Sequence, residues 1–177
     1  MNSEELQVIL DKHQKWLRCE KGGERADLTF VDLSSANLYG ANLRSANLED
    51  ANLRSAKEIP FIPLICPEKG SFTAFKKAYT NNYEGVVVEL EIPSNAKRSS
   101  GTSRKCRASE AKVINIYQHS DNEWKINNDL SPYGFHDESF IYRVGKTAIP
   151  DSFDDDRWNE CSNGIHFFMS FEEAVRW

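Results

Sequence analysis

An uninterrupted five-residue repeat over residues 26–56 constrains the fold of this chain more than any other feature. Each unit begins with Ala or Val, continues with Asp or Asn, and has Leu in third place; the units begin at Ala26, Val31, Ala36, Ala41, Ala46 and Ala51. A period of five matches neither the 3.6-residue period of a helix nor the two-residue period of a strand. A chain that returns Leu to one phase in every unit must turn once per unit, which predicts a solenoid with short sides.

The repeat also predicts which side chains form the solenoid core. We expect the small residues from Ala26 to Ala56 to fill the space beside the inward-pointing leucines, which are Leu28, Leu33, Leu38, Leu43, Leu48 and Leu53. The Asp or Asn before each Leu suits a turn, because a short polar side chain can bond to nearby backbone groups. Stacked coils would lie at roughly the 4.8 Å spacing of paired strands.

The A(D/N)LXX units of residues 26–56 resemble the pentapeptide-repeat family, whose members form a right-handed quadrilateral β-helix with four units per coil. This resemblance implies about one and a half coils, whereas a stable solenoid needs several stacked turns and capped ends. We therefore expect the N-terminal helix to cover one end. The C-terminal part of the chain, or a second copy of the protein, would cover the other.

Residues 3–19 predict an amphipathic helix. Ser3 is placed to cap it, acidic residues occupy the first turn, and Gly22 and Gly23 end it. Its apolar face is predicted from spacings of three and four, and consists of Leu6, Ile9, Leu10, His13, Trp16 and Leu17. The helix and the glycines after it resemble the start of phage and prophage pentapeptide-repeat proteins.

A second domain is predicted after the repeat, because the five-residue period disappears and Pro60, Pro63, Pro67 and Gly70 mark a boundary. The predicted divisions are a capping helix (1–25), a repeat β-helix (26–57), a linker (58–70) and an α+β recognition domain (71–177). Segments rich in β-branched and aromatic residues predict a mostly antiparallel sheet; they are 72–79, 85–92, 110–117, 139–144 and 164–169. Ser170 and Glu173 form a capping box that begins a short closing helix.

Much of this second domain resembles an uncharacterised domain that often follows pentapeptide repeats in phage proteins. The segments that carry the resemblance are 72–79, 88–107 and 157–168, and together they span nearly all of residues 70–177. The resemblance brings no established activity.

A basic segment, residues 97–107, concentrates cationic and hydroxyl side chains around Gly101. Backbone amides and converging cations in such a turn can bind a phosphate or an acidic protein surface. The predicted anion- or partner-binding residues are Arg98, Ser99, Ser100, Arg104, Lys105 and Arg107. A solvated surface loop is the alternative. The acidic stretch 151–156 lacks the calcium-binding loop pattern and predicts a solvated turn, or partners for the basic segment.

The cysteines predict reduced thiols, because they stand far apart without a CxxC pair; they are Cys19, Cys66, Cys106 and Cys161. Cys161 and His166 form the closest Cys–His pair, and their spacing is not that of known zinc modules. We therefore expect no metal site and no cofactor.

The stretch 164–174 resembles the strand-then-helix segment of ADP-ribosyltransferases. This resemblance implies that His166 replaces the aromatic residue that packs on nicotinamide, and that 72–75 forms the opening strand. His166 is thus a candidate catalytic residue. No His-Gly-Thr element stands near residue 72, and no catalytic glutamate is assigned.

Charge and hydropathy narrow the possible partners and locations. The net charge is −5, which argues against bulk nucleic-acid binding. Some pentapeptide-repeat proteins resemble duplex DNA, but one and a half coils is too short, so we expect no direct duplex binding. No run approaches the roughly 18 apolar residues of a membrane span, and the acidic start differs from a secretory signal. We expect a protein of the host-cell cytosol.

The resulting hypothesis is a non-enzymatic binding protein of phage type. The repeat and helix would self-associate, most simply as a two-fold dimer, because an open ladder edge exposes unpaired backbone groups. The C-terminal domain would bind and modulate a host protein or antiviral factor. The alternative is a nucleotide-binding or ADP-ribosyltransferase-like domain that acts on or sequesters a phosphate-containing ligand.

Overall fold

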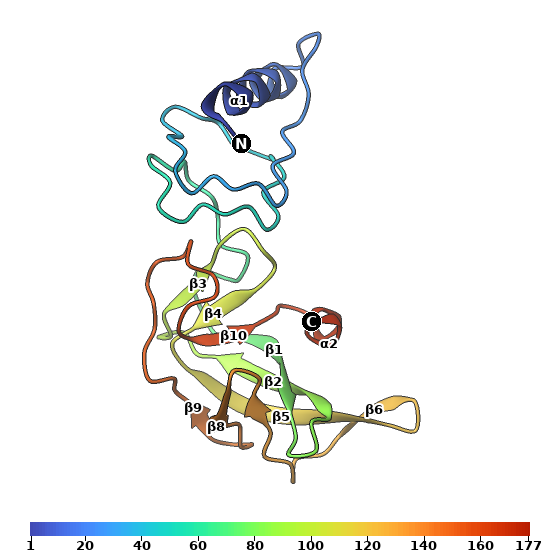
Figure 1. Ribbon diagram of the computed structural model, residues 1–177. Helices are drawn as coiled ribbons and strands as arrows, with labels where there is room; N and C mark the ends of the chain where they lie inside the picture. Colours follow the sequence, from blue (N-terminus) through green and yellow to red (C-terminus); the bar gives the residue numbers. More distant parts are fainter. The chain divides into compact units, whose positions relative to one another are not determined.

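The computed structural model describes residues 1–177 and divides the chain into two compact units, both drawn in Figure 1. The first unit comprises residues 1–64 together with 101–103, and the second comprises 65–100 together with 104–177. The segment 101–103 lies inside the predicted C-terminal domain, yet its contacts group it with the repeats. The finer predicted divisions at residues 25, 57 and 70 stay predictions.

Helix α1 (Ser3–Leu17) starts the first unit and is capped by Asn2 rather than by the predicted Ser3. The Asn2 Oδ1 atom accepts a hydrogen bond of 2.8 Å from the Glu5 amide, and the Glu5 carboxylate accepts one of 3.0 Å from the Asn2 amide. The prediction was wrong by one residue because Asn2 has the extended backbone of a cap, while Ser3 is already helical. The helix also ends at Leu17, two residues before its predicted end.

Close approach of the returning chain to α1 requires glycine at position 23. A Cβ atom placed on Gly23 would lie 2.3 Å from the Trp16 backbone nitrogen, far inside van der Waals contact. Of the predicted apolar face, only Leu6 and His13 are fully buried.

Each five-residue repeat makes one tight turn. In each unit the carbonyl of the third-position Leu accepts a hydrogen bond from the amide three residues later, as between Leu28 and Val31 at 3.1 Å. The Asp or Asn before each Leu accepts a bond from the amide two residues later, which confirms the predicted turn role; the acceptors are Asp27, Asp32, Asn37, Asn42, Asn47 and Asn52.

Parallel bridges join positions that are 20 residues, or four five-residue repeats, apart. The bridges pair Asp27 with Asn47, Asp32 with Asn52, and Asn37 with Lys57. The predicted leucines are buried, with relative exposures of 6% or less, except Leu48, which is only half-buried. The repeat leucines thus form the core of this unit, with one exception.

Both edges of the repeats receive contacts within the first unit. His13, which is completely buried, accepts a hydrogen bond at Nδ1 from the Ala26 amide (3.1 Å), so its Nε2–H donates to the Arg44 carbonyl (3.1 Å). Helix α1 therefore covers one edge, as expected. At the other edge, the Thr102 hydroxyl donates to the Ala51 carbonyl at 2.8 Å.

The second unit is built on a mostly antiparallel sheet, in the order β6-β5-β2-β1-β7-β8, with β9 paired to β5. The strands are β1 (Phe72–Tyr79), β2 (Gly85–Ile92), β5 (Ala111–Ser120), β6 (Glu123–Ile126), β7 (Tyr133–Gly134), β8 (Asp137–Ile141) and β9 (Thr147–Ala148). The predicted bounds of β1 and β2 are confirmed. The strand predicted at 110–117 runs three residues further than expected, and the one predicted at 139–144 lies earlier, at β8.

A three-stranded sheet, in the order β10-β4-β3, completes the unit. Its strands are β3 (Arg98–Ser100), β4 (Cys106–Ala108) and β10 (Ile165–Phe167). The backbones of Phe75 and Phe168 exchange hydrogen bonds of 2.9 and 2.7 Å and so join β1 to the chain after β10. The solvated loop considered for 97–107 is therefore wrong, because two strands with buried residues lie there.

Helix α2 (Phe171–Arg176) closes the second unit. Its predicted capping box is confirmed, since Ser170 and Glu173 exchange two backbone-to-side-chain bonds of 3.2 Å. The Phe171 ring makes edge contacts with the rings of Phe75, Tyr117 and Trp124, at centroid distances of 5.2–5.7 Å. Neither α1 nor α2 has the length and apolar character that a membrane-crossing helix requires.

Candidate ligand-binding cavity

Arg98, the first predicted anion-binding residue, is used to hold the backbone together. Its guanidinium donates to five carbonyl oxygens at 2.9–3.3 Å, those of Pro67, Gly70, Pro93, Ser94 and Ala96. It also lies 5.2 Å from the centre of the Phe72 ring. A guanidinium with this many acceptors is not available to a ligand.

Arg107 has the same kind of role at the acidic turn. Only 2% exposed, its guanidinium donates to the carbonyls of Asp154, Asp156 and Asn163 at 2.8–2.9 Å. Burial lowers its pKa, while the neighbouring carboxylates of Asp154 and Asp156 act in the opposite direction. The acidic stretch therefore does partner the basic segment, mainly through carbonyls, with one exposed ion pair between Lys97 and Asp155 at 2.9 Å.

The remaining predicted residues are dispersed. Ser99 is buried beside the Arg107 guanidinium, and the Ser100 hydroxyl accepts from the Ile65 amide at 2.9 Å. Arg104 forms an ion pair of 2.6 Å with Glu173 at the start of α2. The structure thus does not bring the six residues together at one anion site; of them, Lys105 alone lines the cavity described next.

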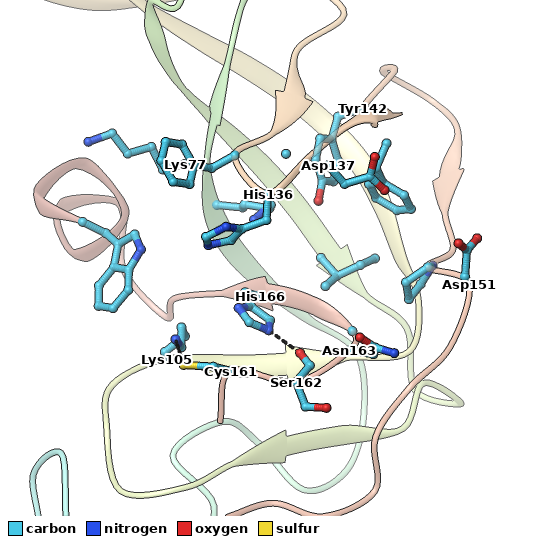
Figure 2. A pocket seen from close by; sticks show the side chains of 18 of the residues that line it. Lys77, Lys105, His136, Asp137, Tyr142, Asp151, Cys161, Ser162, Asn163 and His166 are labelled. Carbon is cyan, nitrogen blue, oxygen red and sulfur yellow. Dashed lines mark hydrogen bonds between the residues drawn. The ribbon is translucent and has the colours of Figure 1, made fainter. Parts of the chain in front are cut away.

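A cavity of about 540 Å³ lies in the second unit, shown from close by in Figure 2. Its walls come from β1, β7, β8 and β10, from the segments 150–152 and 161–164, and from Lys105 and Trp177. This volume lies within the range of about 300–1,000 Å³ that is usual for small-molecule sites. The lining combines three lysines and two histidines with two aspartates and several aromatic rings.

Lys76 is a cavity residue that the sequence analysis did not identify. It lies on β1, its ammonium is 5.9 Å from the centre of the Tyr142 ring, and no carboxylate or hydrogen-bond acceptor pairs with it. Burial, reinforced by the positive charge of Lys105, lowers the pKa of Lys76 to about 8. A strand lysine followed by a second lysine is an unremarkable pattern, so no sequence signal indicated this site.

His166 lies on β10 in the middle of the cavity view (Figure 2), and its Nε2 donates to the Ser162 carbonyl at 2.8 Å. Burial lowers its pKa to about 4, against the opposing effect of that hydrogen bond, and nearby Lys76, Lys105 and Arg107 lower it further. His166 is therefore neutral at pH 7. Its role in an ADP-ribosyltransferase-like site stays a prediction.

Cys161 also lines the cavity and contacts Lys105 rather than His166. The Lys105 ammonium lies 3.5 Å from the Cys161 sulfur and 4.9 Å from the centre of the Trp177 ring. The free cysteines remain thiols in the structure, and nowhere do three or more His, Cys, Asp or Glu side chains gather as metal ligands. Around Lys105 the lining thus combines an ammonium group with a thiol and an aromatic ring.

Comparisons with known proteins match both units. A family of unknown function (DUF5758) matches residues 62–174, and the pentapeptide repeats match residues 24–57. The chain is also 27% identical over 128 residues to "Uncharacterized protein L227" of Acanthamoeba polyphaga mimivirus, covering 59% of this chain and 75% of that protein. No solved structure matches the chain.

Proposed function

We propose that this chain, which belongs to the family of unknown function DUF5758 and carries pentapeptide repeats, is a non-enzymatic binding protein. The repeat unit serves as the assembly module, and the family domain recognises a partner through its cavity. The cavity itself carries this proposal. It offers a concave surface with mixed aromatic and cationic groups, whereas His166, one of its two histidines, donates to a main-chain carbonyl instead of activating a nucleophile.

The cavity mouth suggests how the role in recognition can be tested. Phe135 lines the cavity and is 67% exposed, so replacing it perturbs recognition more than folding. Tyr83 is a matched aromatic residue, 73% exposed and outside the cavity lining. Both side chains can be replaced with aspartate at little cost in stability, since neither is part of the core.

The test is affinity capture from the native cell with the wild type, Phe135→Asp and Tyr83→Asp, each checked for its circular dichroism and melting temperature. We expect the same partner protein with the wild type and Tyr83→Asp, and its loss with Phe135→Asp. Equal capture by all three folded proteins would place recognition elsewhere.

For the repeat unit we propose one and a half coils of a right-handed quadrilateral β-helix that self-associates. The 20-residue separation of the bridges supports a coil of four units. The Leu48 and Leu53 amides at the outer edge donate no hydrogen bond, and unpaired edges of this kind favour pairing with another chain. Modulation of a host protein rests on the resemblance to phage proteins; the mimivirus relative is viral, but its function is not described.

Sedimentation tests the assembly role. We expect the wild type to sediment as a dimer and Leu43→Asp, which places a charge in the repeat core, to lose that mass. The control is Arg54→Asp, which changes an exposed side chain of one five-residue repeat. A monomeric wild type, or an unchanged mass and fold of Leu43→Asp, would contradict self-association through the repeats.

A further inference from the structure

Two ammonium groups face the same cavity from different parts of the second unit. Lys76 comes from β1, and Lys105 immediately precedes β4. No carboxylate or hydrogen-bond acceptor pairs with the Lys76 ammonium, which lies over the Tyr142 ring at 5.9 Å from the ring centre. A largely desolvated cation without a counterion is costly, so its presence at a cavity wall needs an explanation.

The carboxylates of the lining do not supply the missing counterion. The Asp137 carboxylate accepts two bonds from Ser139, from its amide at 2.9 Å and its hydroxyl at 2.6 Å. Asp151 is exposed to solvent and forms no ion pair. Three lysines against two aspartates give the lining an excess of positive charge, to which the neutral His166 adds nothing at pH 7.

The two ammonium groups also repel each other, since the positive charge of Lys105 contributes to the low pKa of Lys76. An anion bound between them would remove both the repulsion and the unpaired charge. A phosphate monoester carries about −1.5 to −2 charges near pH 7, so it would supply the counterion that Lys76 lacks and would also attract the positive charge of Lys105, since lysines bind phosphate as point charges. A carboxylate supplies only one charge.

Aromatic rings occupy the walls beside these lysines. The Trp177 ring lies 4.9 Å from the Lys105 ammonium, and the Tyr142 ring lies next to Lys76. A bare phosphate would fill only a small part of a cavity of about 540 Å³. The remaining space and the Trp177 ring, which is 65% exposed, suit a flat, uncharged group, since stacking on aromatic side chains is favourable.

Taking the cavity as the recognition site proposed above, we infer that it binds a small phosphate monoester that carries a flat ring. The ammonium groups of Lys76 and Lys105 hold the phosphate, and the ring stacks against the aromatic wall that includes Trp177. This site differs from the predicted one at 97–107, whose arginines are engaged with backbone carbonyls and Glu173.

Isothermal titration with phenyl phosphate and with AMP tests this site on the full chain. Phenol supplies the ring without the phosphate, and inorganic phosphate supplies the charge without the ring. We expect both monoesters to bind at least tenfold more tightly than either fragment. No binding of either monoester would overturn the proposal, and equal affinity for inorganic phosphate and phenyl phosphate would overturn the role of the ring.

Two variants locate the binding. We expect Lys76→Met to weaken phenyl phosphate binding at least tenfold while raising the melting temperature, because it removes an unpaired charge that is largely withdrawn from water. A weaker binder that folds more stably cannot be explained by misfolding. Lys112→Met, on the exposed side of β5, should bind normally. Unchanged binding by Lys76→Met would overturn the proposal. Partner capture that depends on Phe135, without phosphate binding, would leave the proposed function intact and refute this inference alone.

Discussion

The contacts that stabilise the inside of each unit differ between the two units of this chain. In the repeat unit, hydrogen bonds recur with the sequence period: each Leu carbonyl accepts from the amide three residues later, and bridges join residues that are 20 positions apart. In the second unit, single arginines bind carbonyls that are tens of residues distant, as Arg107 does at Asn163. We therefore expect stability to be distributed over the repeats and concentrated at a few side chains in the family domain.

The largest expected effect is on Arg107. Arg107→Lys removes the planar fork that donates to several carbonyls of the 154–163 segment, and leaves buried acceptors without donors. We expect a loss of about 3–4 kcal/mol of unfolding free energy, measured by urea denaturation. Lys97→Met, which removes an exposed ion pair, is the control and should cost less than about 1 kcal/mol. Equal, small losses would show that stability is not concentrated at Arg107.

In the repeat unit, the loss of stability on replacing a leucine should depend on how deeply that leucine is buried. Leu38→Ala removes a buried side chain and should cost about 2–4 kcal/mol, whereas Leu48→Ala removes a half-buried one and should cost about half as much. Denaturation followed by a probe in the repeats measures both. Similar losses at the two positions would contradict the difference in burial.

Replacing Lys76 should raise the free energy of unfolding, whereas the substitutions above should lower it. The pKa of Lys76 falls from 10.5 to about 8, so the folded protein binds fewer protons than the unfolded chain between these values. The unfolding free energy of the wild type should therefore rise as pH increases from about 8 to 10.5. Lys76→Met should be about 2 kcal/mol more stable at pH 7, after a discount for partial exposure, and should lack this rise. A destabilised variant would contradict the unpaired charge.

The smallest expected effect is at acid pH. Because the pKa of His166 is lowered from 6.5 to about 4, its neutral form stabilises the fold fully above pH 6.5, and this contribution is lost as pH falls toward 4. Between those values the wild type should lose about 1–2 kcal/mol more than His166→Gln, whose amide can still donate to the Ser162 carbonyl. Parallel pH profiles of the two proteins would refute this.

The same contrast explains what could be predicted from sequence. The role of each repeated Leu, and of the Asp or Asn before it, follows from its place in the repeat. The turns and most of the core could therefore be predicted from the period alone. Leu48 was the exception, because it is only half-buried although it occupies the same place in its repeat as the buried leucines.

In the family domain, the role of a charged side chain depends on residues that are far from it in the sequence. Arg98 and Arg107 looked like an anion site because several of the carbonyls they bind come from residues 67–70 and 154–163, which sequence spacing cannot place beside them. Lys76 looked ordinary because only the fold reveals the missing carboxylate. The capping box of Ser170 and Glu173 was predictable for the opposite reason, since its partners are three residues apart.

The central claim is that the cavity of the family domain is a recognition site built around an unpaired lysine. The most direct measurement is the NMR titration of the Lys76 side chain, with 13C at Cε, in the absence and presence of phenyl phosphate. We predict a midpoint near pH 8 that moves upward with the ligand, because a bound dianion favours the charged amine. A midpoint near 10.5 that phenyl phosphate does not move would contradict the claim.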